Sequence, residues 1–539
     1  MKKNLLSGTF WLSSASILCK VLGIVYLIPW LMMMGSQKSG LEAQALYNVA
    51  YLPYALFLTL GTAGFPSGIA KQIATERENR QRVGELFKSS VAVMEVIGVV
   101  SALLMFIFAP WLSRVSPVSD VAQATWAIRS LCPSLLVIPI LSAMRGYFQG
   151  MSDMVPYSVS QVLEQFIRVI VILAGTFYFR VLTDGSVFAA VIISTMASCF
   201  GGVISILYLM KVGKRKNYFR LRYFVVRPNS LLRGRRAIVV SIIKESLPFI
   251  YVGAAISLSQ LIDQVTLKTI LHTVLGKLNT KEVEVLYTQA SANPNKLTVL
   301  LLSVVNSVAV TSLPLLVSVN RTEELMKSIA DILRLSLTFL LPASLGMIVL
   351  AEPMYTIFFG YDPSTTGYML LAVLATVACC GFSVVFAILQ ALGFHRKSMR
   401  LVTKGLLLKF ALQLPLVAWL QGYGLHLATI GAFSFMTIRG YRFLCQEFAI
   451  RPLRYVRDYL KRITIATVVM GIICRVCYQI LAAHLVMSQR MQAFLVCAVV
   501  ALIGTLVYSL LGLPEQLKRA KRTLNGNQKS KKVPSDLDK

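Results

Sequence analysis

The chain has 539 residues, of which 56% are hydrophobic and only 14% are charged. Soluble domains carry about 25% charged residues, so this composition excludes an ordinary soluble enzyme, and the 33 glycines and 19 prolines follow no period that would indicate a collagen-like or low-complexity chain. Lysine and arginine outnumber aspartate and glutamate by 54 to 23, a formal net charge of +31. In a soluble protein this excess would point to nucleic acid, whereas in a membrane protein it marks the loops held on the cytoplasmic side.

Apolar runs long enough to cross a membrane recur along the whole chain. A transmembrane helix needs about 20 mostly apolar residues to cross about 30 Å of hydrocarbon. The first run is too long for the apolar core of a signal peptide, so we expect it to be retained. The predicted fold class is therefore an all-α membrane protein with about fourteen transmembrane helices. Their approximate positions are 8–34, 47–70, 89–111, 124–145, 157–179, 186–210, 242–272, 297–319, 329–351, 366–393, 401–420, 424–445, 463–484 and 491–513.

Basic residues sort to alternate loops of this predicted topology. The loops on the side of the amino terminus are strongly basic, above all residues 211–240 and the tail 516–539. Short cytoplasmic loops carry the excess of lysine and arginine, so both termini are predicted to lie in the cytoplasm and the chain in the cell membrane. The exceptions are four lysines around one loop on the other side, Lys268, Lys277, Lys281 and Lys296.

The basic loop 211–240 and the tail leave several partners open. They could bind anionic lipid headgroups or proteins, or serve only as topology signals. No aromatic-interleaved or folded reader module accompanies the charge, so no nucleic-acid partner is expected.

The two halves of the chain resemble each other at an offset of roughly 245 residues, as in many transporters built from internal repeats. Pro66 and Pro314 each lie late in a predicted span and precede a polar loop, and Pro110 and Pro353 each follow at the end of the next helix. The same order in both halves predicts parallel repeats related by an axis along the membrane normal. The predicted domains are a six-helix lobe over 1–235, a six-helix lobe over 236–450, two additional helices over 451–515 and a basic cytoplasmic tail over 516–539.

Ionisable residues in the middle of a span are the main candidates for function, because charges in hydrocarbon usually face a cavity or a partner. Lys20, near the middle of the first span, is predicted to bind an anionic substrate group such as a pyrophosphate, and the alternative is a structural ion pair. Asp263 lies mid-span in the seventh helix, where it could pair with Lys20 or hold a coupling cation. A third possibility for Asp263 is a local hydrogen bond to Ser257, Ser259 or Gln260. Lys20, Asp263 and Gln260 are the predicted cavity residues.

A second group of charges lies on the fourth and fifth predicted helices. Glu164 and Arg168 are four residues apart and can pair on one helix face, and Arg145 can approach the same point. These three residues are predicted to form a buried polar staple near the inner gate, with a structural role favoured over substrate contact. Four other charges are predicted to be interfacial, Arg129, Glu95, Lys409 and Arg475.

Glycine and proline mark candidate hinges. Gly61, Gly64 and Pro66 in the second predicted helix would loosen its backbone hydrogen bonds, and Pro314 repeats the device in the eighth. Transporters need helices that bend between states, although small residues also allow close helix packing.

Motifs for metal binding or catalysis are weak. Cys474 and Cys477 have the spacing of half a zinc or redox site, but no second pair follows and the four histidines are scattered, so no metal site is expected. The sequence contains neither a P-loop nor an HExxH motif, so we expect neither an enzyme nor an ATP-driven pump. No cofactor is expected, with coupling to the membrane potential or to a monovalent cation left open.

Three stretches carry a family resemblance. They are TFWLSSASILCKVLGIVYLIPW (9–30), LGTAGFPSGIAKQIATE (60–76) and RGYFQGMSDMVPYSVSQVLEQFIRVIV (145–171), the last being the most specific. Together they resemble the polysaccharide-export branch of the multidrug/oligosaccharidyl-lipid/polysaccharide flippase superfamily. Within it they most resemble the MurJ-like lipid II flippases, a group that includes the stage V sporulation protein B relatives.

The resemblance implies two six-helix lobes around a central cavity that opens alternately to each side. It implies that helices 1, 2, 7 and 8 line the cavity and that the last two helices form a groove for a lipid tail. It also implies several arginines in the cavity, whereas Lys20 is the one clear mid-span cation of those four helices in this sequence.

The function that follows from the resemblance is a flippase. It would move undecaprenyl-linked lipid II, the peptidoglycan precursor, to the outer leaflet for cell-wall synthesis, with membrane lipids and cell-wall synthases as further partners. The alternatives are a flippase for another lipid-linked polysaccharide or teichoic unit, a cation-coupled multidrug exporter, and a membrane scaffold. Mid-span Lys20 and Asp263 argue against a scaffold, which has no need of buried charges.

Overall fold

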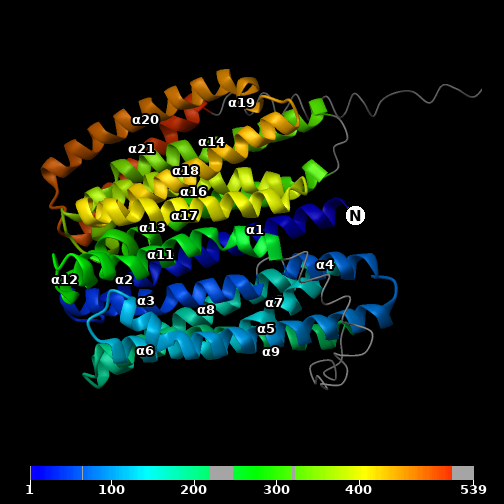
Figure 1. The fold of residues 1–539 in the computed structure, drawn as a ribbon, viewed down its shortest axis with the longest axis horizontal. Coiled ribbons are helices and arrows are strands. Elements are labelled where there is room, and N and C mark those ends of the chain that lie inside the picture. The colour runs from blue at the N-terminus through cyan, green and yellow to red at the C-terminus, as the bar shows by residue number, and fades with distance from the viewer. Residues whose placement is uncertain (1, 63–64, 219–246, 318–321, 513–539) are drawn as a thin grey trace, which may run out of the picture.

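The computed structural model describes residues 2–62, 65–218, 247–317 and 322–512. Helices make up 89% of the structure, and the described ranges contain no strand. Most helices run along one direction and form an elongated bundle (Figure 1). The all-α membrane fold expected from the hydropathy pattern is confirmed.

The amino-terminal half contains nine α-helices and one π-helical turn in the described ranges. They are α1 (Lys2–Val25), α2 (Leu27–Met32), α3 (Gln37–Thr62), α4 (Phe65–Thr75), α5 (Arg80–Val115), α6 (Val121–Arg129), α7 (Cys132–Gly150), α8 (Met154–Phe177), η1 (Tyr178–Leu182) and α9 (Val187–Arg215).

The second half begins with the helical segment Leu247–Gly253, which meets the next helix at a bend of 49°. The later elements are α11 (Ala255–Lys268), η4 (Thr269–Val274), α12 (Thr280–Tyr287), η5 (Thr288–Ala292), α13 (Asn293–Val317), α14 (Thr322–Val349), α15 (Ala351–Phe359), α16 (Thr365–Ala391), α17 (His395–Leu420), α18 (Gly422–Glu447), α19 (Pro452–Tyr455), α20 (Arg457–His484) and α21 (Arg490–Gly512).

All fourteen predicted spans contain helices. Ten of them are long and apolar enough to cross a membrane, and the bent pair Leu247–Gly253 and Ala255–Val274 makes eleven. The other three predicted spans correspond to α3, α13 and α18. Several spans are broken where one helix was expected, because a proline favours the start of a new helix: Pro133 lies in the first turn of α7 and Pro66 in that of α4.

Two lobes share one internal arrangement. In the first, α7 lies at the centre and packs against α4, α5 and α9. In the second, α16 lies at the centre and packs against α13, α14 and α18. The last two helices, α20 and α21, pack against each other and against α14 and α15 at the edge of the bundle (Figure 1). The domain boundary at 235/236 and the tail 516–539 lie outside the described residues, so the exact boundaries stay a prediction.

The two ends of the bundle differ in how the lobes meet. We call the end at which α1 begins the N-side, and the opposite end, where α2, α6 and α12 lie, the far side (Figure 1). On the far side one apolar core contains residues of both lobes, among them Tyr47 and Leu267. On the N-side the described residues form two cores, around Phe148 in the first lobe and Phe386 in the second, and Ile250 of the second half packs into the first.

Polar contacts reinforce the far-side junction. Gln264 of α11 donates from Nε2 to the backbone oxygen of Val49 (3.2 Å) and to Ser116 Oγ (2.8 Å) in the first lobe. The backbone N–H and the hydroxyl of Ser119 donate to Glu284 Oε2 of α12, the first at 2.8 Å. The far side is therefore closed in this structure.

The predicted hinge residues lie at different points of their helices. Helix α3 ends at Thr62 and α4 begins at Phe65, so Gly61 and Pro66 flank the break between them. Gly64 lies outside the described residues, and Pro314 falls in the last turn of α13. A bending role for these residues stays a prediction.

The glycines of the stretch RGYFQG allow α4 and α7 to approach closely. A Cβ atom on Gly146 would lie 2.8 Å from the backbone oxygen of Pro66, and one on Gly150 would lie 2.8 Å from that of Ala70. Their four-residue spacing puts both glycines on one helix face, the small-residue pattern of close packing in membranes.

This packing predicts the effect of adding one methyl group. Gly150→Ala should lower the stability of the purified protein by about 1–3 kcal/mol, because backbone and Ile73 must move to admit it. Gly68→Ala in α4 is the matched control, since its Cβ would meet no atom within 4 Å and alanine favours helix by about 1 kcal/mol. Thermal unfolding in detergent measures both, and equal melting temperatures for the two variants would contradict the packing argument.

Candidate functional site

A central cavity of about 360 Å³ lies between the lobes. The first lobe lines it from α1, α2, α3 and α8, and the second from α11, α12, η5 and α13. These correspond to predicted helices 1, 2, 7 and 8, with helix 5 in addition. Among the lining residues are the predicted Lys20 and Gln260.

The charged residues that line the cavity are all cations: Lys20, Arg168 and Lys296. Arg168 pairs with Glu164, which leaves the two lysines without an ion-pair partner among the described residues. The Lys296 ammonium is buried, has no hydrogen-bond partner in the described part of the chain, and lies 5.5 Å from the ring centroid of Tyr47. Because unpaired ammonium groups in hydrocarbon are costly, the cavity is suited to an anionic ligand.

Aromatic residues form one wall of the cavity. Tyr47 and Tyr51 of α3 both line it, and their rings stack at 5.7 Å. Trp30 meets Tyr47 edge-on at 5.8 Å behind this wall and donates from Nε1 to Ser194 Oγ at 3.1 Å. The wall is therefore rigid and carries both apolar faces and hydroxyls, as sites for large amphipathic ligands do.

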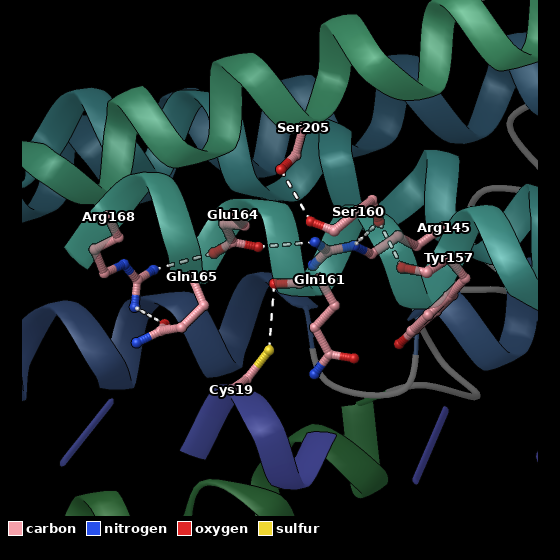
Figure 2. Close-up of polar contacts among 9 residues, drawn as sticks. All are labelled: Cys19, Arg145, Tyr157, Ser160, Gln161, Glu164, Gln165, Arg168 and Ser205. Atoms are coloured by element: carbon pink, nitrogen blue, oxygen red, sulfur yellow. Dashed lines mark hydrogen bonds and ion pairs between the residues drawn. The ribbon is translucent and has the colours of Figure 1, made fainter. Parts of the chain in front are cut away.

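The residues of the predicted staple contact one another (Figure 2). One carboxylate oxygen of Glu164 accepts a hydrogen bond from Arg145 Nη2 at 2.9 Å, and the other accepts one from Arg168 Nη2 at 3.0 Å. Arg145 also donates from Nε to Ser160 Oγ at 2.9 Å. These side chains are 13–16% exposed, so one carboxylate serves two largely buried arginines. A gate function for the staple stays a prediction.

The staple is tied to the cavity at its Arg168 end. Arg168 lines the cavity, as does Gln165, which lies within 3.5 Å of its guanidinium (Figure 2). Cys19, next to Lys20 on α1, donates from Sγ to the backbone oxygen of Gln161 at 3.4 Å. The position of α1, and with it Lys20, therefore depends on α8.

Asp263 does not pair with Lys20. Its carboxylate lies 2.7 Å from the ammonium of Lys409 in α17, within the second lobe. The prediction that Lys409 is interfacial is wrong, because its side chain is 0% exposed. Asp263 and Gln260 line a second, smaller cavity of about 60 Å³. This cavity shares Gln260, Asn295 and Val299 with the central one.

The structure places Lys296 and Lys409 differently from the expectation based on sequence. Lys296 precedes the apolar run at 297 and is therefore expected in a loop, whereas Lys409, inside the predicted span 401–420, is expected at the membrane interface. In the structure α17 extends from His395 and α13 from Asn293, with π-turn η5 before it, which places both lysines inside long helices. A π-turn near a cavity is a common functional feature, but its sequence signal is weak.

The described residues hold no group of three histidine, cysteine, aspartate or glutamate side chains able to bind a metal. Cys474 instead packs between α20 and α21, where its thiol lies 3.7 Å from the backbone oxygen of Val500.

The staple predicts a large effect of removing its shared carboxylate. Glu164→Gln should destabilise the protein by on the order of 3 kcal/mol, because it leaves two buried guanidinium groups without a counter-charge. Glu76→Gln is the control, since the Glu76–Arg82 pair is 32% and 66% exposed and should contribute at most about 1 kcal/mol. Thermal unfolding distinguishes the two, and a Glu164→Gln protein as stable as the control variant would rule out the staple.

Two relatives from one organism match this chain over very different lengths. The protein described as "Lipid II flippase MurJ" from Bacillus subtilis (strain 168) is 28% identical over 94% of this chain and 95% of its own length. "Stage V sporulation protein B" from the same organism is 29% identical over 41% of both chains.

Solved structures show the same fold. "Lipid II flippase MurJ, inward closed conformation" matches with a TM-score of 0.64 at 14% identity, covering 93% of this chain and 97% of its own. An "inward-facing conformation of a multidrug resistance MATE family transporter of the MOP superfamily" matches with a TM-score of 0.61 at 17% identity, over 82% and 98%.

A family model also matches residues 5–320, which include the three stretches noted above and the whole first lobe. With a match over more than half its length, and with the same fold as the flippase and transporter structures, the chain belongs to the polysaccharide biosynthesis protein family.

Proposed function

We propose that this protein is a flippase that moves undecaprenyl-linked lipid II from the inner to the outer leaflet of the cytoplasmic membrane. The cavity with only cationic charges, between two lobes, is the observation that carries the proposal. Its relatives in sequence and fold include proteins described as lipid II flippases. A lipid-linked diphosphate supplies the anion that such a cavity needs, and a sugar supplies the surface that its aromatic wall would contact.

Lys20 and Lys296 face the cavity from opposite lobes, on α1 and α13. A diphosphate bound between them would offset both ammonium charges and draw the lobes together. Because the ligand contacts both lobes, a change in their relative position changes its binding, which is the requirement for ligand-driven alternating access.

The orientation proposed for the molecule follows from its basic loops. Among the described residues, the basic starts of α5 and α17 lie on the N-side, so this side would face the cytoplasm, and we place both termini there. The far side, closed by Gln264 and by Ser119 with Glu284, would then be the outer gate. The staple of Arg145, Glu164 and Arg168 would hold α7 and α8 together while the chain bends between α3 and α4, at Gly61, Gly64 and Pro66, and while α13 bends at Pro314.

The polyprenyl tail would stay in the hydrocarbon layer while the headgroup crosses. The additional helices α20 and α21, at the edge of the second lobe, are the proposed groove for it. Cell-wall synthases that consume lipid II on the outer face would be natural partners, and the membrane potential favours movement of an anionic headgroup outward.

The charge of the cavity bears on the multidrug alternative. The charged residues that line the central cavity are all cations, and they would repel a cationic drug. Another lipid-linked polysaccharide or teichoic unit carries the same diphosphate and is therefore the second candidate substrate. It differs from lipid II in the chemistry of its headgroup.

The cavity lysines give the first test. Lys20→Ala and Lys296→Ala should each lower the rate of translocation at least about tenfold, because each variant loses a charge-assisted contact with the substrate. Lys20→Arg should keep part of the activity. Lys71→Ala, an exposed lysine of α4, is the control and should leave the rate unchanged. Full activity in Lys20→Ala would contradict the proposed role of the cavity.

The substrate is tested with the purified protein in liposomes. Fluorescent lipid II and an undecaprenyl-linked teichoic precursor are placed in the inner leaflet, and their arrival outside is followed by a membrane-impermeant quencher. We expect lipid II to move faster than the teichoic precursor. Equal rates would indicate broad specificity for lipid-linked diphosphates, and movement of the teichoic precursor alone would overturn the lipid II proposal.

A further inference from the structure

A fully buried lysine lies in the second lobe, away from the cavity lysines. The Lys409 side chain is 0% exposed, and its ammonium is surrounded by three oxygen atoms from two other helices. These are Asp263 Oδ1 of α11 at 2.7 Å, the backbone oxygen of Leu425 of α18 at 2.8 Å and Thr429 Oγ1 of α18 at 2.6 Å. Lys409 therefore joins α11, α17 and α18.

The chain brings these oxygens together through a tight turn. Helices α17 and α18 are joined at Gln421, whose φ is +49°, and a Cβ on Gly424 would lie 2.3 Å from the backbone oxygen of Leu416. Glycine at 424 thus allows the first turn of α18 to lie directly against α17. The carbonyl of Leu425 and the hydroxyl of Thr429 consequently accept hydrogen bonds from the Lys409 ammonium.

The three oxygen atoms around the Lys409 ammonium are of the kind that bind a small metal cation. A carboxylate, a backbone carbonyl and a hydroxyl are hard oxygen donors of the kind that bind group 1 and group 2 metal ions. Further polar groups lie beside them in the 60 Å³ cavity, including Asn295, Thr298 and Thr376. In this chain the positive charge comes from a side chain, since the Lys409 ammonium occupies the centre of the oxygen cluster.

We propose that Lys409 is a tethered cation, which fills a monovalent-cation site built from Asp263, Leu425 and Thr429. The native protein then takes up no metal ion at this site, and removal of the lysine side chain exposes a site for Na⁺. The consequence for coupling rests on the proposed transport function, whereas cation binding itself can be tested without substrate.

The position of the site explains why a fixed charge there matters. Asp263 and Gln264 are neighbours on α11: the first faces Lys409 in its own lobe, and the second makes the far-side contacts with Val49 and Ser116. Gln413 of α17 adds a second tie to α11 by donating to Thr266 Oγ1 at 2.8 Å. A tethered cation keeps α11 attached to α17 throughout the cycle, where a dissociable ion would release it.

The test compares thermal unfolding of the purified full-length protein in NaCl and in choline chloride at equal ionic strength. The native protein should melt at the same temperature in both salts. Lys409→Ala should melt lower in choline and recover in NaCl by about 2 °C or more, saturably, because a bound ligand stabilises the folded state. Lys404→Ala, an exposed lysine one turn earlier on α17, should show no specific response to Na⁺.

A double variant identifies the ligand. Lys409→Ala combined with Asp263→Asn should lose the response to Na⁺, because the only carboxylate of the site is gone. A folded Lys409→Ala protein without a Na⁺ response, or a response that survives Asp263→Asn, would overturn the proposal.

If Lys409→Ala does not fold, transport by the native protein still tests the proposal independently. Its translocation of lipid II in liposomes should proceed equally in Na⁺, K⁺ and choline at a fixed membrane potential. A requirement for Na⁺ in the native protein, in unfolding or in transport, would contradict a tethered cation. Absence of lipid II movement in all three salts would instead count against the proposed function and leave the unfolding comparison to decide the site.

Discussion

The cost of placing a charge in hydrocarbon organises this protein. A charged side chain at the centre of a span costs about 2.5–3.5 kcal/mol on insertion scales, so each one needs an opposite charge or a polar cavity. The spans satisfy this requirement in two ways. Glu164 lies between two arginines and Asp263 lies against Lys409, so these charges are neutralised within a lobe. No residue in the described part of the chain neutralises Lys20 or Lys296, and both line the cavity between the lobes.

The paired and unpaired charges have different consequences. The pairs connect helices of the same lobe, α7 with α8 and α11 with α17, and so help each lobe to move as a unit. The unpaired lysines come from α1 and α13, one from each lobe, and an anion between them would link units that must move apart. Stable lobes around an incompletely neutralised cavity are what a carrier of anionic headgroups requires.

The sequence predicted the fold better than the site. Helix positions depend on local hydropathy, so the spans were located correctly, and Glu164 with Arg168 follows from four-residue spacing on one helix. The partner of Asp263 is 146 residues away, and no local pattern specifies which face of α17 meets α11. Lys296 is expected in a loop because it precedes an apolar run, and the structure shows that α13 starts before it. The burial of Lys409 depends on the distant residues Asp263 and Thr429, which the local sequence around Lys409 does not specify.

In the proposed transport cycle the far side must open so that the headgroup can leave the cavity. Ser119 and Glu284 meet across that junction, so cysteines at both positions, in a variant whose nine native cysteines are replaced, can be joined by a short bifunctional reagent. We expect that the joined protein no longer moves lipid II across a liposome membrane and that cleaving the reagent restores movement. Translocation at an undiminished rate with the junction joined would contradict it.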